Sequence, residues 1–209
     1  DKRVTINGEI CIKKDIHVNI DTDLIVVDGQ VVNTTQQYYV KFHKPKGYVT
    51  AVEDANHPVV MDLLPPEYVK MGVVPVGRLD KDTEGLLLLT NDGVWGHSII
   101  NGNKHVPKVY YVEFEGELSE EGINRIKEGI LLGDGTHCKP AIIEPLTVHS
   151  VNITIEEGKY HQVKRMIGAA GGSVTYLKRL TIGHVDLSGI EEVGSVMDLT
   201  IDDIEGFKK

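Results

Sequence analysis

A polar loop between two apolar runs, within residues 73–93, constrains the fold more than any other part of the chain. The first run is Val73–Val76. The second is Leu86–Leu89, four leucines bounded by Gly85 and an Asn-Asp-Gly turn signal. An apolar run of this length between turn signals predicts a fully buried strand. Asp80 is therefore expected on a loop clamped between two buried strands, where a scaffold can hold a reactive group in a fixed geometry.

The residues of this loop, VGRLDKDTEGLLLLTNDG at positions 76–93, closely resemble the catalytic motif of the pseudouridine synthases that modify ribosomal RNA. An arbitrary Arg-x-Asp loop is more often a turn with a solvated ion pair, because such pairs are common and contribute little to stability. An ungapped match over 18 residues is much more specific than a short pattern. The resemblance implies that Asp80, the aspartate of Gly-Arg-Leu-Asp, is the essential catalytic residue.

Three further segments resemble motifs of that family, in the family's order, and the resemblance extends from about Val4 to Leu199. They are a lysine-proline motif at 42–48, a Lys-x-Tyr motif at 108–110 and a third motif, EGKYHQVKRM, at 157–166. The match is closest to the enzymes that act on small-subunit ribosomal RNA. A large-subunit or transfer RNA synthase remains an alternative, as does a non-catalytic RNA-binding or ribosome-assembly protein.

The reaction that the resemblance implies breaks the C–N glycosidic bond of a uridine, rotates the base and rejoins it to the ribose by a C–C bond. Asp80 has to be ionised, whether it attacks covalently or removes a proton from the sugar, and both routes stay open. The resemblance makes Lys164 its cationic partner. Because the target base has to leave its stack, Tyr110 of the Lys-x-Tyr motif is expected to be a stacking platform that can also assist proton transfer.

Seven side chains are expected to contact the RNA. Arg78, two residues before Asp80, is placed to hold a phosphate or to fill the gap that the flipped base leaves. The other six come from the remaining motifs: Lys44, Lys46, Lys108, His161, Gln162 and Arg165. For Lys44 and Lys46, phosphate contact and ordinary surface charge are equally open interpretations. The expected partner is ribosomal RNA or a small-subunit assembly intermediate, bound by a monomer.

The net charge of −9, from 22 Lys and Arg against 31 Asp and Glu, does not by itself favour an RNA partner. Binding depends on local potential, however, and three segments contain no acidic residue: Gly29–Val52, Val94–Val112 and Gly158–Val185. These segments hold 10 of the 22 basic residues. If they converge in the fold, they form a basic face on an acidic body.

No cofactor and no metal is expected. The two cysteines, Cys11 and Cys138, have no metal-binding spacing, and the sequence contains no dinucleotide or phosphate-loop fingerprint. No apolar stretch is long enough for a membrane span, and no signal-peptide pattern opens the sequence. A cytoplasmic protein without a membrane partner is therefore expected.

The 209 residues are enough for one large domain and a small appendage. Strand signals joined by tight turns, mixed with helix signals, predict an α+β fold with a mixed, mainly antiparallel central sheet and flanking helices. Residues 36–209 are expected to form the catalytic domain. Residues 1–35, with an Asn-Gly and an Asp-Gly hairpin signal, resemble the C-terminal half of the family's small β-rich RNA-binding module. The helical half of that module is expected to be absent.

Periodicity and capping signals predict the individual elements. Besides the two apolar runs, strands are expected at Tyr38–Phe42, Val109–Phe114, Ala141–Ile143, Val151–Ile155 and Leu180–Leu187. Helices are expected at Trp95–Ile100, Glu120–Gly129 and His161–Ala170. In the last helix Lys164 lies on the shoulder of the apolar face, from which its side chain can reach a cleft.

Overall fold

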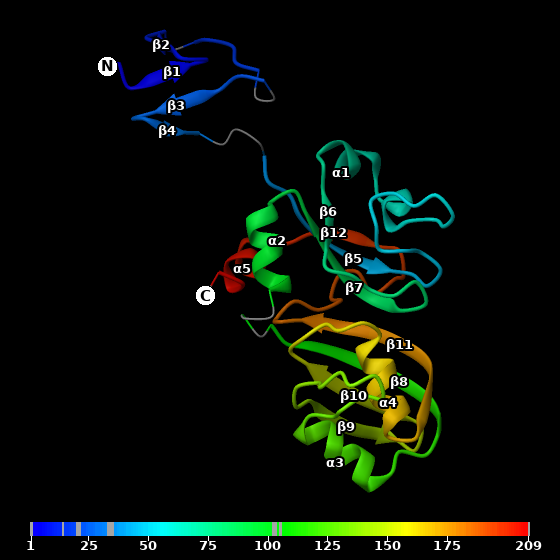
Figure 1. Cartoon of the computed structure of the whole chain (residues 1–209). Coiled ribbons are helices and arrows are strands. Elements are labelled where there is room, and N and C mark those ends of the chain that lie inside the picture. The colour runs from blue at the N-terminus through cyan, green and yellow to red at the C-terminus, as the bar shows by residue number, and fades with distance from the viewer. Residues whose placement is uncertain are drawn as a thin grey trace. The chain divides into compact units, whose positions relative to one another are not determined.

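The computed structural model describes residues 2–13, 15–19, 22–32, 36–101, 104 and 106–208. The chain forms two compact units, Asp1–Gln37 and Tyr38–Lys209, called here the small unit and the large unit (Figure 1). The expected domain boundary after residue 35 stays a prediction, because residues 33–35 lie outside the described part.

The small unit is a four-stranded antiparallel sheet of two hairpins, with the strand order β2-β1-β3-β4. Its strands are β1 (Val4–Ile6), β2 (Glu9–Cys11), β3 (Ile25–Val27) and β4 (Gln30–Val31). Asn7 and Gly8 in one turn, and Asp28 and Gly29 in the other, all have positive φ. Two central residues with positive φ match the turn twist to that of the strands, so both predicted hairpins are confirmed.

The large unit is built on an eight-stranded sheet, counted over the described residues, with the order β12-β5-β7-β11-β8-β10-β9 and β6 paired to β7. All pairs are antiparallel except β7 with β11, so the predicted mixed, mainly antiparallel α+β fold is confirmed. The strands are β5 (Tyr39–Lys44), β6 (Val74–Val76), β7 (Glu84–Thr90), β8 (Lys108–Gly116), β9 (Ile142–Thr147), β10 (Ser150–Ile155), β11 (Gly172–Ile182) and β12 (Val196–Asp198).

The helices lie on both faces of this sheet (Figure 1). They are η1 (Val60–Leu63, a 3-10 helix), α1 (Pro66–Lys70), α2 (Gly93–Ile100), α3 (Glu120–Glu128), α4 (Gln162–Ala169) and α5 (Ile201–Gly206). Capping side chains hold the starts of α2 and α3: Asp92 accepts from the backbone of Trp95, and Ser119 accepts from that of Gly122. No helix in the described part of the chain is long and apolar enough to cross a membrane.

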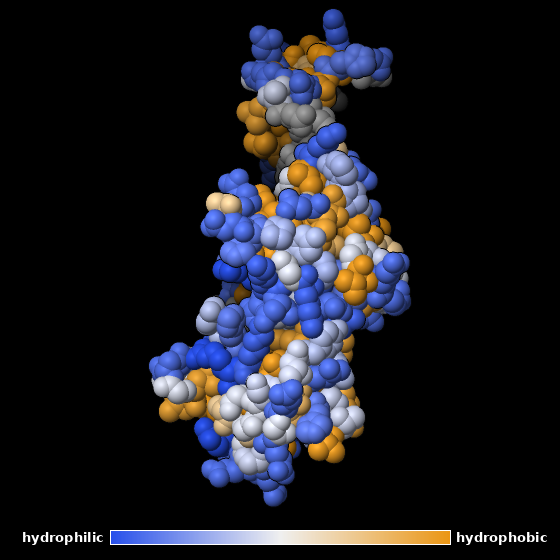
Figure 2. Space-filling model, turned by 90° about the vertical axis from the view of Figure 1, so that its right-hand side faces the viewer, coloured by the Kyte–Doolittle hydropathy of each residue, from blue (hydrophilic) through white to orange (hydrophobic). Residues whose placement is uncertain are grey.

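Strand β7 lies at the centre of the sheet and separates two apolar clusters. Leu87 and Leu89 belong to the larger cluster, with buried residues of α3 and α4, whereas Leu86 and Leu88 face the smaller one around Trp95 of α2. All four leucines are fully buried, because side chains alternate between the faces of a strand and both faces are covered. The predicted buried strand is therefore confirmed. On the outside, hydrophilic residues form a band across the middle of the large unit in Figure 2.

Two strand predictions need correction. Leu180–Leu187 is not one strand: β11 ends at Ile182, and the chain turns at Gly183, which has a φ of 57°. Strand β11 starts at Gly172, earlier than predicted, because the polar residues between positions 172 and 179 interrupt the apolar pattern that indicates a strand. Strand β9 runs beyond Ile143 and through Pro145, which is tolerated because β9 is an edge strand that need not donate to a further neighbour.

Strands β7 and β11 approach most closely at Gly85, just after the Asp80 loop. Gly85 has a φ of +118°, and a Cβ added there would lie 2.2 Å from the carbonyl oxygen of Arg179. A side chain at this position would push apart the one parallel pair described in the sheet, which joins Lys178 to Glu84 and Arg179 to Gly85.

Gly85→Ala is expected to lower the free energy of unfolding by on the order of 3 kcal/mol or more, because it combines backbone strain with a backbone clash. Gly93→Ala is the matched control, since an added Cβ at Gly93 meets nothing within 4 Å. Urea unfolding of both variants measures the difference. Equal midpoints for the two variants would contradict a close β7–β11 contact.

Candidate active site

Asp80 lies on the loop between β6 and β7, and its side chain is 31% exposed. Its Oδ2 is 3.2 Å from the Nζ of Lys164, and its Oδ1 is 3.6 Å from the Nε2 of His161. Both partners come from the N-terminal end of α4, far from Asp80 in the sequence. The structure thus brings Asp80 together with Lys164, as the sequence predicted, and adds His161 beside them.

The backbone of the Asp80 loop is held from the side of β5. The Nζ of Lys44 donates to the carbonyl oxygens of Asp80 (3.1 Å) and Thr83 (2.8 Å), as well as to that of Pro45 (3.0 Å). Thr50 holds the other end: its hydroxyl donates to the carbonyl oxygen of Leu79 and accepts from the Leu79 amide. These contacts fix the backbone on both sides of Asp80.

This geometry corrects the interpretation of Lys44 as a phosphate contact. Its side chain is 0% exposed, and its ammonium group is surrounded by backbone carbonyls of the loop. A phosphate in solvent has no access to it. Lys44 is instead a positioning residue that keeps the Asp80 loop in place.

Lys164 forms a bridge between two carboxylates. Its Nζ is 3.2 Å from Asp80 and 2.5 Å from Asp82. Partial burial lowers the pKa of Lys164, but the hydrogen bonds to Asp82 and Asp80 raise it, and the net direction is upward. Burial raises the pKa of Asp82 while the Lys164 ammonium lowers it, with a net downward direction. Lys164 is therefore held as a cation beside Asp80. Sequence reasoning missed Asp82, although it lies within the matching motif.

His161 and Gln162 begin α4 and play different parts. His161 is in the left-handed region, with a φ of 47°, which is uncommon for a residue other than glycine and turns the chain into the helix. Gln162 is buried: its Nε2 donates to Glu157, and its Oε1 accepts from the amide of Lys159. Both ends of the Gln162 side-chain amide are therefore hydrogen-bonded to residues of the 157–166 motif, and we do not propose Gln162 as an RNA contact.

Tyr110 lies on β8, opposite the Asp80 loop, and is 8% exposed. Its hydroxyl group is 3.4 Å from the Nη1 of Arg179, whose Nε donates to the carbonyl oxygen of Leu86. Arg179 is 3% exposed, and its Nη2 has no partner among the described residues. The sequence placed Arg179 only in an acid-free segment; its burial beside Tyr110 was not predicted.

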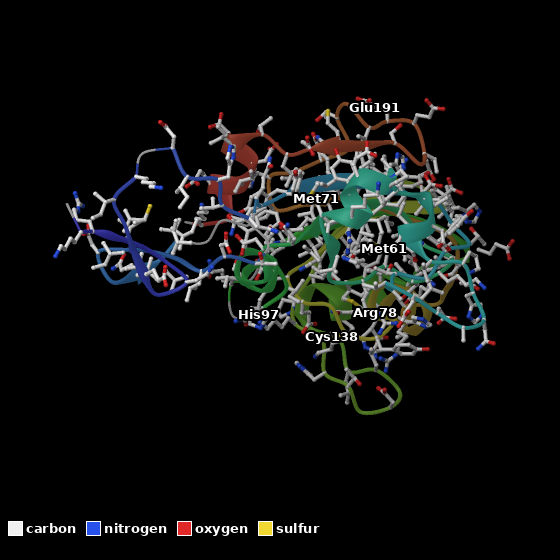
Figure 3. The ribbon with its side chains drawn as sticks, turned by 90° about the horizontal axis from the view of Figure 1, so that it is seen from above. Met61, Met71, Arg78, His97, Cys138 and Glu191 are labelled. Atoms are coloured by element: carbon white, nitrogen blue, oxygen red, sulfur yellow. The ribbon has the colours of Figure 1, made fainter. Side chains whose placement is uncertain are left out.

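The remaining candidates are spread more widely. Arg78 is exposed and lies on the same side of the large unit as Cys138, away from Glu191 (Figure 3). Lys46 is exposed, with its Nζ 4.1 Å from the ring centroid of Tyr176. Arg165 pairs with Asp134, and Lys108 donates to the carbonyl oxygen of Val106. Burial and the nearby charge of Arg179 lower the pKa of Lys108 to about 8.

A cavity of about 650 Å³ opens between these elements. It is lined by Asp80, His161, Tyr110, Val163 and Leu177, among other residues. Its volume lies in the range of small-molecule sites. A carboxylate with a fixed backbone and a neighbouring ammonium group can act there as a nucleophile or as a base. The described residues contain no group of three or more His, Cys, Asp or Glu that could hold a metal ion.

The buried lysine makes folding depend on pH. Burial lowers the pKa of Lys44 from its ordinary 10.5 to about 8, although the charges of Asp82 and Asp80 act in the opposite direction. A lysine that binds its proton less tightly in the folded state makes the free energy of unfolding rise with pH, here between about 8 and about 10.5. Lys44→Met is expected to lose this rise, which amounts to about 1–3 kcal/mol.

Urea unfolding at several pH values between about 7 and about 10 measures this slope. Lys46→Met is the control, because Lys46 is an exposed lysine of the same motif. Subtracting the profiles removes the contribution of Lys108, which is common to all three proteins. A Lys44→Met profile parallel to that of the wild type would contradict the assigned burial of the ammonium group.

Comparisons with known proteins identify the family of this chain. A family model described as RNA pseudouridylate synthase matches residues 38–169. The chain is 43% identical over 192 residues to the RNA pseudouridine synthase YtzG of Bacillus subtilis. The aligned residues cover 90% of this chain and 80% of that relative. It is 36% identical over 204 residues to the ribosomal small subunit pseudouridine synthase A of Yersinia pestis, covering 97% and 86%.

Solved structures show the same likeness. A crystal structure of a pseudouridylate synthase matches with a TM-score of 0.76 and 36% identity, over 99% of this chain and 89% of that one. A structure of an H/ACA ribonucleoprotein bound to a substrate RNA matches with a TM-score of 0.51 and 15% identity, over 73% and 49%, which shows a shared fold alone. By its match to the family model and its near full-length relatives, the chain belongs to the RNA pseudouridine synthases.

Proposed function

We propose that this chain isomerises a specific uridine of small-subunit ribosomal RNA to pseudouridine. The observation that carries the proposal is Asp80 beside Lys164 at a cavity of about 650 Å³, on a loop whose backbone is held by Lys44. The choice of RNA rests on the relative from Yersinia pestis, whose name specifies the ribosomal small subunit. Its proposed substrate is ribosomal RNA, either free or within a small-subunit assembly intermediate. The chain is proposed to act as a monomer in the cytoplasm.

The proposed reaction needs no cofactor, because atoms and electrons balance within the nucleotide. The bond between the ribose and the base nitrogen breaks, the base rotates, and its C5 bonds to the ribose. C5 loses a proton, and the released nitrogen gains one. Asp80 either bonds to the sugar or removes a proton from it, and its charge is stabilised by Lys164, 3.2 Å away. Tyr110 lines the same cavity, and its hydroxyl group is proposed to relay a proton.

The RNA contacts are proposed for side chains that remain accessible. Arg78 is exposed beside Asp80, and His161, Lys46 and Arg165 are at least partly exposed. Lys108 is partly exposed and, within the described part of the chain, donates to the carbonyl oxygen of Val106; it is proposed as a phosphate contact. Residues 1–35 are proposed to add an RNA-binding surface to the catalytic residues 36–209, by resemblance to the family's N-terminal module.

Mapping pseudouridines in ribosomal and transfer RNA, from cells with and without this protein, tests the substrate. We expect one pseudouridine to disappear from small-subunit ribosomal RNA and to return when the wild-type gene is restored. A loss from large-subunit or transfer RNA instead would replace the proposed substrate with one of the two alternatives. No change in any RNA would favour a non-catalytic RNA-binding or assembly protein.

Asp80→Asn is expected to abolish turnover while leaving the fold intact. The amide has the shape of the carboxylate but cannot act as a nucleophile or a base. Because the side chain is partly exposed, the stability change is expected to stay within about 1 kcal/mol. Turnover is measured with RNA carrying tritiated uridine, and folding by thermal melting. A well-folded variant with substantial turnover would exclude Asp80 as the catalytic residue.

Tyr110→Phe is expected to bind RNA normally but to turn over more slowly, on the order of 100-fold if the hydroxyl relays a proton. Phe is the informative change because the buried ring stays in place, whereas Tyr110→Ala would cost about 3–5 kcal/mol of stability. Single-turnover kinetics separate the chemical step from RNA binding. Turnover of the Phe variant at the wild-type rate would exclude proton relay by the hydroxyl group and leave Tyr110 only the role of a ring that packs against the base.

A further inference from the structure

Tyr160 is the most exposed aromatic side chain of the large unit in the described residues, with 76% of its surface accessible. Its ring is stacked on that of His161, with centroids 3.9 Å apart and an angle of 18° between the planes. One face of the tyrosine is therefore covered by the histidine. The other has no ring partner among the described residues and is a flat, apolar surface in solvent.

This stacked pair is held in place by the start of α4. The left-handed backbone of His161, with a φ of 47°, sets the direction in which both rings project. The Nη1 of Arg165 donates to the carbonyl oxygen of Tyr160 (3.2 Å), which fixes the peptide before the helix. His161 is also tied to the site, since its Nε2 lies 3.6 Å from Asp80. The exposed ring thus has a fixed position relative to the reacting carboxylate.

Tyr160 also lies between two hollows. The first is the cavity of about 650 Å³ that contains Asp80. The second, of about 480 Å³, is lined by Arg165, Asp134 and Leu132. Among the described residues, Tyr160 alone lines both. Because Tyr160 borders both hollows, an RNA strand that runs directly from the first to the second would pass this ring.

We propose that the free face of Tyr160 stacks against the base of a nucleotide adjacent to the flipped uridine. The backbone of that nucleotide continues into the second hollow, where Arg165 can exchange part of its ion pair with Asp134 for a phosphate. This inference rests on the proposed function and names a residue that positions the substrate. Stacking on an aromatic ring tolerates any base, so Tyr160 holds the strand in register without selecting a sequence.

The test uses an RNA fragment of the small subunit that contains the mapped uridine. Tyr160→Ala is expected to raise KM about tenfold with little change in kcat, whereas Tyr160→Phe, which keeps the ring, is expected to match the wild type. Tyr111→Ala is the control, because Tyr111 lies on β8 with its side chain on the face opposite Tyr110 and away from both hollows. Thermal melting checks that each variant is folded.

A second arm separates stacking from a purely structural role. RNA that lacks the base at one or the other neighbour of the uridine is given to the wild type and to Tyr160→Ala. At one neighbour, loss of the base is expected to raise KM for the wild type about tenfold and to have no further effect on Tyr160→Ala. An equal penalty in both proteins at both positions, or a wild-type KM for Tyr160→Ala, overturns the inference. Absence of wild-type turnover on any ribosomal RNA overturns the proposed function itself.

Discussion

The whole site depends on one buried ammonium group. Lys44 has no exposed surface, and a buried charge is tolerated only where hydrogen-bond partners replace water. Here the partners include the backbone carbonyls of Asp80 and Thr83 in the loop between β6 and β7, and that of Pro45 after β5. Because an ammonium group donates in three directions, the carbonyls have to converge on it, and the loop has little freedom to move. The Asp80 loop is thus held through its backbone, and the side-chain oxygens of Asp80 lie beside Lys164 and His161.

The sheet topology brings the other parts to this loop. Strand β11 runs parallel to β7 for a short stretch at Gly85, directly after the loop, and it carries Arg179 towards Tyr110. Strand β8 pairs with β11 on its other side and brings Tyr110 to the cavity that Asp80 also lines. Helix α4 starts after a left-handed turn at His161 and adds Lys164. Each reactive group thus comes from a different element, and the order of strands sets their distances.

Much of this could be predicted from local patterns. The four leucines of β7 predicted a buried strand, and Ser119 as a cap predicted α3, because these signals act over a few residues. The pairing of Asp80 with Lys164 followed from motif resemblance. The burial of Lys44 and Gln162 could not be predicted, because lysine and glutamine are mostly exposed. Only the tertiary fold surrounds the Lys44 ammonium group with backbone acceptors, and the Gln162 side chain is bonded to Glu157 and to the amide of Lys159. The early start of β11 was missed since its exposed face is polar.

The burial of these cations changes how the chain can bind RNA. Of the ten basic residues in the acid-free segments, Lys41, Lys44 and Arg179 are buried and cannot meet a phosphate in solvent. Lys164 and Arg165 are already paired with carboxylates. With a net charge of −9, the remaining cations offer less electrostatic attraction than the sequence suggested. Contacts that do not depend on charge, such as base stacking on exposed aromatic rings, therefore have to supply a larger share of the affinity, and they act only where the geometry of the strand fits.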